Sequence, residues 1–246
     1  MKKIFVLLLL AFFYSGPVSA ENHPVKVLLY HNVSAPEDMP ENPYVMPLSR
    51  FREQMAWLKE NGFHCLTVSD MFDAMETGGL PEKAAVITFD DGYPGVYTYA
   101  FPLMKEYGFP ATEYLVAGKT GMPKNLSANM IREMSEAGWE IGSHSMTHPD
   151  LADHDDLDTE ICGSRKLISD ITGIPLQEIS SFAYPYGSAD EMVMNKVWKC
   201  GYQTGGGLGQ IPVVHGQNRF YFSRHPVTSD MTTAQFASLF DEGDTE

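Results

Sequence analysis

The chain has 246 residues, of which 43% are hydrophobic and 20% are charged. This composition is too apolar for a disordered protein, and the length suits one large domain or two small ones. Seventeen lysine and arginine residues against 32 aspartate and glutamate residues give a formal net charge of −15. Because an acidic surface repels phosphate backbones, we expect no nucleic-acid partner, whereas a neutral or cationic substrate suits the chain.

The first 20 residues have the three parts of a secretory signal peptide. Lys2 and Lys3 form a basic head, residues 4–14 form an apolar run, and residues 18–20 are small, as signal peptidase requires. The apolar run has 11 residues, fewer than the roughly 18–20 that span a bilayer, so we expect cleavage rather than an uncleaved anchor. The mature chain, residues 21–246, is therefore expected to be a single exported domain, periplasmic or extracellular, that does not span a membrane. We expect it to be a monomer.

After this segment, short β-rich runs alternate with amphipathic helical patterns. Strands are expected at residues 25–30, 84–89, 111–116, 139–143, 181–184 and 219–227. Helices are expected at residues 49–61, 96–107, 128–137 and 156–172, and a capping box of Ser188 and Glu191 begins another helix toward Cys200. This alternation predicts an α/β fold in which helices cover parallel strands, as an open sheet or a (β/α) barrel. In both folds the active residues collect at the C-terminal ends of the strands.

The three cysteines are Cys65, Cys162 and Cys200. An oxidising compartment allows one disulfide and one free thiol, but no spacing indicates which two cysteines would join. Nothing resembles a Cys-x-x-Cys zinc knuckle. We therefore expect the three cysteines to be mainly core residues, and the disulfide pairing stays open.

Two adjacent carboxylates, Asp90 and Asp91, follow the expected strand at residues 84–89. Inside a strand these neighbours would point to opposite faces, but at a strand end followed by Gly92 the backbone can turn both into one cleft. Paired acids allow one carboxylate to bind a cation while the other accepts a proton. The alternative is an ordinary turn at the end of a strand, built on common Asp-Gly chemistry.

Two histidines, His144 and His148, follow the expected strand at residues 139–143. Spaced four apart on one helical turn, they can present both imidazoles to one metal ion. With a carboxylate from the neighbouring strand end they form a candidate two-histidine, one-carboxylate site. Three protein ligands would leave coordination positions of the metal open for water, which favours a catalytic site for zinc or another first-row divalent ion. The alternative is that the two histidines belong to a polar loop without a metal.

Two further strand ends carry weaker signals. Pro185, Tyr186 and Gly187 fix a turn that can aim a backbone N–H at a bound oxygen, although alone they favour an ordinary turn. His31 ends the first expected strand, and a lone histidine is more often structural. Polar residues at four separate strand ends nevertheless favour an active site.

Three segments, TFDDGY at 88–93, HSMTHPDL at 144–151 and AYPYG at 183–187, resemble in this order the signature motifs of the polysaccharide deacetylase family, carbohydrate esterase family 4 with the NodB-homology domain. The resemblance covers about residues 25–227. LLYHNV at 28–33 and RFYFSRHPV at 219–227 resemble the subgroup that includes exported deacetylases of poly-N-acetylglucosamine. The resemblance implies a distorted (β/α) barrel of about seven parallel strands with outer helices.

The resemblance also implies roles for the first two motifs. Asp90 is expected to be the general base. Asp91, His144 and His148 are expected to hold a divalent metal, with zinc as the expected ion.

On the substrate side, the resemblance implies that Pro185 and Tyr186 bind substrate, with the Tyr186 N–H at the oxyanion. Most of the family takes its general acid from a late Leu-x-His motif, but His215 and His225 lack that setting. The subgroup with the early histidine uses it as the acid, so we expect His31 in this role.

Two departures from the family pattern affect the site. Many members have an arginine where this chain has Ala183, and that arginine contacts the catalytic aspartate. In this chain the role is either vacant or filled by Arg219 or Arg224. Arg224 is also expected to bind substrate. The late motif of aspartate and tryptophan that lines the acetyl pocket is not evident, and Trp198 is the candidate substitute.

We therefore expect a metal-dependent hydrolase that removes N-acetyl groups from N-acetylglucosamine residues of a polysaccharide. An O-acetyl polysaccharide esterase remains an alternative because its chemistry is nearly identical. A catalytically silent carbohydrate-binding module on the same scaffold is the other alternative, and the intact base and metal-binding residues argue against it. The sequence leaves the glycan and its linkage open.

Overall fold

The computed structural model describes residues 23–35 and 42–241, so the expected signal peptide lies outside the described residues. Parallel strands form one curled sheet in the order β10-β1-β5-β6-β7-β8-β9. Their bounds are β1 Lys26–Tyr30, β5 Ala84–Asp90, β6 Thr112–Leu115, β7 Glu140–Ser143, β8 Ser181–Ala183, β9 Thr204–Gly206 and β10 His225–Pro226. β4 (His64–Leu66) pairs with the first half of β5, and β6 pairs with its second half. A separate two-stranded sheet joins β2 (Asn32–Ser34) to β3 (Val45–Pro47).

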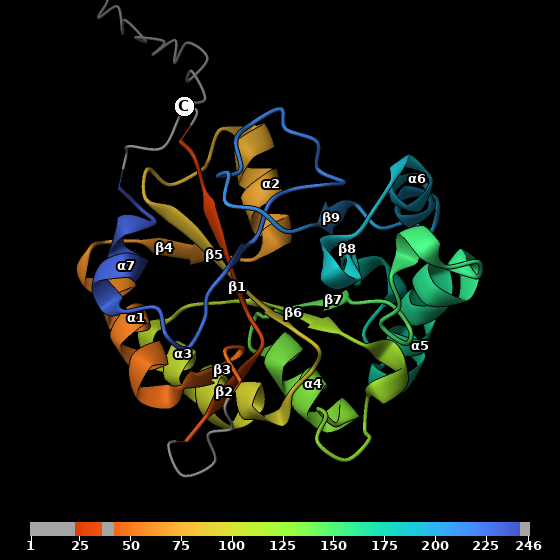
Figure 1. The fold of residues 1–246 in the computed structure, drawn as a ribbon, viewed down its shortest axis with the longest axis horizontal. Coiled ribbons are helices and arrows are strands. Elements are labelled where there is room, and N and C mark those ends of the chain that lie inside the picture. Colours follow the sequence, from red (N-terminus) through yellow and green to blue (C-terminus); the bar gives the residue numbers. More distant parts are fainter. Residues whose placement is uncertain (1–22, 36–41, 242–246) are drawn as a thin grey trace, which may run out of the picture.

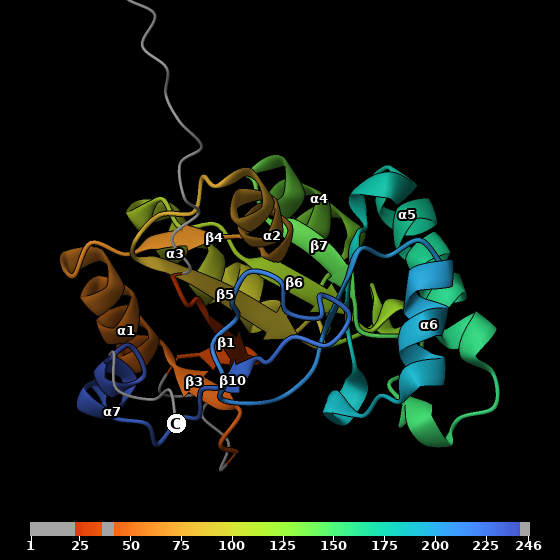
Figure 2. The same ribbon diagram turned by 90° about the horizontal axis from the view of Figure 1, so that it is seen from above.

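The helices lie around the strands (Figure 1). They are α1 Leu48–Glu60, α2 Val68–Thr77, α3 Phe101–Tyr107, α4 Ala128–Glu136, α5 Ser164–Thr172, α6 Glu191–Lys199 and α7 Thr233–Ser238. Shorter turns are η2 Val96–Ala100, η3 Ala117–Lys119, η4 Leu151–Asp153, η5 Asp158–Gly163, η6 Leu176–Glu178 and η7 Pro185–Gly187. Both ribbon views place α1 with α7 at one side of the molecule and α5 with α6 at the other (Figure 2).

The sheet closes on itself through the segment at residues 219–224. Gly205 donates to the Arg219 carbonyl at 2.8 Å, and Gly207 donates to the Phe222 carbonyl at 2.8 Å, so this segment runs beside β9. It then enters β10, which pairs with β1. This closure, together with the outer helices, confirms the expected distorted (β/α) barrel.

The expected strand at residues 219–227 is wrong for most of its length, because only His225–Pro226 form a regular strand. Asn218 begins a turn instead: its carbonyl accepts from the Tyr221 N–H at 3.2 Å, and its side chain accepts from the Phe220 N–H at 2.9 Å. These local bonds compete with the strand ladder for the backbone.

Two expected helices are each divided in two. Residues 96–107 form the π-helical turn η2 followed by α3, and residues 156–172 form the π-helical turn η5 followed by α5. The capping residue of α6 also differs from expectation. Asp190, rather than Ser188, accepts a hydrogen bond from the Val193 N–H at 2.8 Å and caps the helix.

The core has two parts, one on each face of the curled sheet. Leu28 and Ile87 belong to the cluster that also includes buried residues of the outer helices. Val27 and Val86, their neighbours along the strands, belong to a second cluster that includes the buried side chains of α2. Because successive strand residues point to opposite faces, α2 covers the inner face. The C-terminal ends of the strands are not covered by α2, and a cleft lies there.

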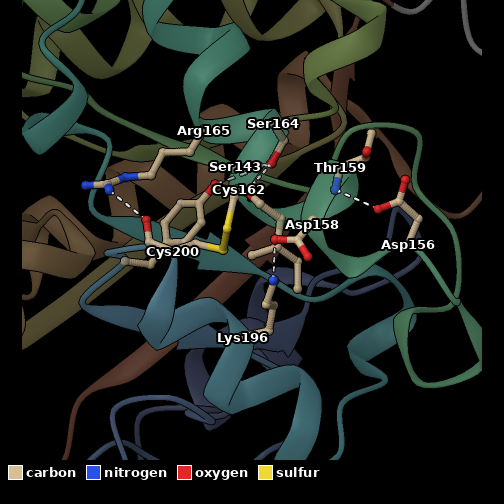
Figure 3. Close-up of a disulfide and its surroundings, with 11 residues drawn as sticks. Ser143, Asp156, Asp158, Thr159, Cys162, Ser164, Arg165, Lys196 and Cys200 are labelled. Carbon is tan, nitrogen blue, oxygen red and sulfur yellow. Dashed lines mark hydrogen bonds and ion pairs between the residues drawn. A yellow bond between two sulfur atoms is a disulfide. The ribbon is translucent and has the colours of Figure 1, made fainter.

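Cys162 and Cys200 form the disulfide, which joins η5 to the C-terminal end of α6 (Figure 3). Cys65 is free and buried in β4. Within the described residues, no helix combines the length and the apolar character that crossing a bilayer requires.

Candidate active site

A cleft of about 740 Å³ lies at the C-terminal ends of the strands. All but one of the residues that we expected in the site line it, namely His31, Asp90, Asp91, His144, His148, Tyr186 and Arg224. The exception is Pro185, which is buried within its turn and is not among the lining residues. Its expected substrate contact stays a prediction.

Asp91, His144 and His148 lie close enough together to hold one metal ion. Each offers a ligand atom, and these atoms lie within 4.8 Å of one another. The Nε2 atom of His148 is 3.7 Å from Oδ1 of Asp91, and both side chains are partly exposed to the cleft. The set has the two-histidine, one-carboxylate composition of a catalytic divalent-metal site.

The protonation of His144 also fits a metal ligand. Its Nδ1 is 2.8 Å from the Ala183 carbonyl oxygen, which can only accept, so Nδ1 carries the proton and Nε2 presents its lone pair. Burial lowers the pKa of His144, which favours the neutral imidazole that a metal requires.

The two histidines lie on an irregular loop rather than on the helical turn that their spacing indicated. Ser145 and His148 have φ of 67° and 71°, a left-handed conformation that is rare outside glycine. Asp91 and Tyr186, with φ of 78° and 59°, share this conformation. Backbone strain is thus concentrated around the cleft, as it often is at functional sites.

Asp90 forms a buried bidentate ion pair with Arg224. The two guanidinium nitrogens donate to the two carboxylate oxygens at 2.6 and 2.9 Å. Burial by itself raises the pKa of Asp90, but the charge of Arg224 and the hydrogen bonds that it donates outweigh this effect, and the pKa falls to about 2. Asp90 is therefore ionised at neutral pH.

Of the two candidate arginines, the structure brings Arg224 to the aspartate. Arg219 instead donates to Glu76 at the surface, at 2.7 Å. Arg224 is fully buried and also donates to the Gly207 carbonyl at 3.2 Å. Its direct contact with substrate stays a prediction.

Among the candidate acids, His31 lines the cleft and packs against Tyr44, with ring centroids 4.7 Å apart. His225 does not line the cleft, and burial together with the charge of Lys26 lowers its pKa. His215 is exposed on a loop outside the cleft. The geometry therefore favours His31 over both late histidines.

The Tyr186 turn forms one wall of the cleft. The ring of Tyr186 is exposed and lies 4.7 Å from the ring of His148, centroid to centroid. Tyr221 fixes the turn from outside by donating to the Gly187 carbonyl at 2.8 Å. The role of the Tyr186 N–H toward an oxyanion stays a prediction.

The expected substitution by Trp198 is wrong, because this residue is exposed on α6 and does not line the cleft. Tyr44 and Leu208 contribute apolar surface there instead. Sequence reasoning missed both, since each lies in an irregular segment without a periodic pattern.

Comparison with known proteins agrees with the family resemblance of the sequence motifs. The family model for polysaccharide deacetylase matches residues 77–205, more than half of the chain. The chain is 28% identical over 218 residues to YxkH of Bacillus subtilis strain 168, which bears the family's name, covering 87% of this chain and 75% of that protein. It is 26% identical over 200 residues to a poly-beta-1,6-N-acetyl-D-glucosamine N-deacetylase of Staphylococcus aureus strain MRSA252, covering 76% of this chain and 69% of the relative.

Solved structures show the same relationship. The crystal structure of a polysaccharide deacetylase from Bacillus cereus superposes with a TM-score of 0.79 at 27% identity, covering 89% of this chain and 69% of that one. The family match and the structural superposition each cover most of the described residues. The chain belongs to the polysaccharide deacetylase family and is a deacetylase hydrolase.

Proposed function

We propose that the protein is a metal-dependent N-deacetylase that acts, as a monomer, on N-acetylglucosamine residues of a poly-N-acetylglucosamine type of glycan. The observation that carries this proposal is one cleft in which Asp91, His144 and His148 lie beside the ionised Asp90–Arg224 pair. The relative named for poly-beta-1,6-N-acetyl-D-glucosamine supports the choice of glycan.

The metal site has a defined place in this proposal. Asp91, His144 and His148 would hold a divalent cation, with zinc as the expected ion. When bound, such a cation supplies Lewis-acid chemistry: it polarises a carbonyl and makes a coordinated water more acidic.

Asp90 is proposed as the general base. Its carboxylate is ionised and can accept a proton from the water that attacks the acetyl carbonyl. The two hydrogen bonds from Arg224 fix the orientation of the carboxylate. Arg224 thus keeps the base charged inside a buried environment.

The departing amine needs a proton, because an amide anion is too basic to leave. His31 is proposed as the donor, since it lines the same cleft as Asp90 and His148. The backbone N–H of Tyr186 is proposed to stabilise the oxyanion, and preorganised donors of this kind contribute about 3–4 kcal/mol where measured. A bound transition-state mimic whose oxygen lies beyond hydrogen-bond distance of this N–H would contradict that assignment.

The experiment that tests the function measures acetate release from N-acetylglucosamine oligomers of defined linkage and from acetylated xylan. We expect release from the N-acetylglucosamine oligomers in the presence of zinc. His144→Ala is the control variant, and it should lose both the bound metal and the activity. Release from acetylated xylan alone would favour an O-acetyl esterase, and glycan binding without release would favour a silent binding module. A metallated, active His144→Ala protein would contradict the metal site.

We also propose that the protein is exported and that residues 1–20 are removed. The basic head, apolar run and small residues of this segment support the proposal, and a disulfide is typical of proteins in oxidising compartments. Mass spectrometry of the exported protein should find an N-terminus at Glu21. An intact Met1 terminus would contradict cleavage.

A further inference from the structure

Glu160 binds the loop that connects the two histidines of the metal site. Its Oε2 accepts hydrogen bonds from the Met146 and Thr147 N–H groups at 3.0 and 2.9 Å. Its Oε1 accepts from the Thr147 hydroxyl at 2.7 Å. The residue is only 3% exposed. A single buried carboxylate therefore holds the middle of the segment between His144 and His148.

This loop needs external support. Ser145 and His148 adopt the left-handed conformation, which is unfavourable for any residue other than glycine. Such a backbone persists only where the surrounding structure fixes it. Ala117 and Gly118 donate to the Ser145 and Met146 carbonyls at 3.0 and 2.9 Å, while Glu160 binds N–H groups. The loop is thus fixed through its carbonyls by one segment and through its amides by Glu160.

The segment that carries Glu160 is itself anchored. Glu160 lies in the π-helical turn η5, and Cys162, two residues later, is joined by the disulfide to Cys200. Asp158, from the same turn, pairs with Lys196 of α6. Figure 3 shows both links from η5 to α6 close together. Covalent and ionic links therefore hold η5 against α6 on both sides of Glu160.

We propose that Glu160 is a positioning residue for the metal site. Its carboxylate holds the backbone at Met146 and Thr147 so that His144 and His148 present their ring nitrogens to the same point as Asp91. This inference rests on the proposed metal function. Removal of groups that orient metal ligands typically weakens metal binding about 10–100-fold, and we expect an effect in this range for loss of the Glu160 carboxylate.

Glu140 provides a matched control. Its carboxylate also accepts three hydrogen bonds, from the Ser69 N–H at 3.0 Å, the Ser69 hydroxyl at 2.7 Å and the Thr112 hydroxyl at 3.0 Å. It lies at the first residue of β7, at the opposite end of the strand from His144. Glu140→Ala therefore removes a comparable network without touching the histidine loop.

The experiment measures the zinc affinity of the purified protein by competition with a chromophoric chelator, and the thermal unfolding of the metal-free form. Glu160→Ala should raise the zinc Kd about 10–100-fold. Glu160→Gln should restore most of the affinity, because its amide oxygen can still accept both N–H groups. Glu140→Ala should lower the unfolding temperature and leave the zinc Kd unchanged.

Equal zinc affinity in Glu160→Ala and the unaltered protein would overturn the inference, as would an equal loss of affinity in Glu140→Ala. If Glu160→Ala does not fold, Glu160→Asp decides: its shorter side chain should weaken zinc binding while Glu160→Gln does not, and equal affinities would overturn the inference. Failure of the unaltered protein to bind zinc would instead overturn the proposed metal function.

Discussion

The cleft has a sealed half and an open half, although the two begin at adjacent residues. The side chains of Asp90 and Arg224 are 3% and 0% exposed, and each satisfies the charge of the other. The side chains of Asp91 and His148 are 17% and 19% exposed, and their nearest ligand atoms stand 3.7 Å apart. Two neighbouring aspartates can thus have different tasks, because the protein neutralises one and leaves the other for a cation.

The backbone separates these two aspartates. Asp90 shares the inner face of β5 with Val86 and Thr88, since alternate strand residues face the same side. Asp91 follows with φ of 78°, which ends the strand and sends its side chain elsewhere. Substitutions in the two halves should therefore affect different properties, namely stability and turnover in the sealed half and metal binding in the open half.

The largest effect is expected from breaking the sealed pair. Arg224→Met leaves the buried Asp90 carboxylate without its charged partner, which should lower the free energy of unfolding by about 3–5 kcal/mol. Arg219→Met is the matched control, because its ion pair with Glu76 is at the surface and should contribute only about 0–1 kcal/mol. Urea unfolding measures both variants. Equal losses of unfolding free energy in the two variants would show that the Asp90–Arg224 pair contributes no more to stability than a surface ion pair.

Next in size is the contrast between the two aspartates. Asp90→Asn should keep its zinc and lose turnover about 100-fold or more, because the amide cannot accept the proton. Asp91→Asn should lose the zinc. Metal analysis and acetate release measure the two effects. The opposite pattern would exchange the two assignments.

Replacement of the proposed acid should lower turnover by about 100-fold. His31→Ala should keep its metal, and it should lose the alkaline limb of the pH–rate profile because a general acid acts only while protonated. His225→Ala is the comparison, since that histidine does not line the cleft. Normal turnover in His31→Ala beside an inactive His225→Ala would move the acid to β10.

The smallest effect is expected at Tyr186. Tyr186→Gly keeps the backbone N–H and relieves a φ of 59°, so thermal unfolding should show a gain of about 1 kcal/mol. Activity should remain within about tenfold of the original, because the proposed oxyanion donor is the backbone. A loss well beyond tenfold would assign the function to the tyrosine ring instead of the N–H.

The candidate metal ligands could be predicted from sequence because they lie in short segments that follow apolar strands. Asp90 and Asp91 follow one predicted strand, and His144 and His148 follow another, so strand-end placement brings the four residues together. The family resemblance, and not the placement, assigns Asp91 to the metal. The loop conformation of the two histidines could not be predicted, since a four-residue spacing is equally compatible with a helical turn. Only the positive φ values of Ser145 and His148 distinguish the two.

The partner of Asp90 in the sealed half could not be settled from the sequence, which left Arg219 and Arg224 as alternatives. Arg224 lies 134 residues after Asp90, and a single arginine has no local pattern that marks its partner. Its position depends on closure of the barrel between β9 and β1. The Cys162–Cys200 pairing depended on the same kind of long-range placement, in this case of η5 beside α6.

Local distortions within helices were also beyond sequence reasoning. The π-helical turns η2 and η5 each form the first part of a segment that we expected to be one helix. Only the first of these segments contains a proline, Pro102 in the opening turn of α3, that marks the division. A π-helical turn inserts extra backbone without a required residue type, so periodicity does not reveal it. The three-residue strands β2, β3, β4 and β9 are too short to show alternation.

The long separation of Asp90 from Arg224 has a consequence for the order in which the molecule folds. β5 can pair with β4 and β6 before Arg224 has docked, but at that stage a charged Asp90 has no counter-ion on the inner face. Burying an unpaired carboxylate is costly, so Asp90 must stay hydrated or take up a proton until the 219–226 segment joins β1. Burial of Asp90 in its charged form is therefore coupled to closure of the barrel, because only the closed barrel supplies Arg224 as its counter-ion.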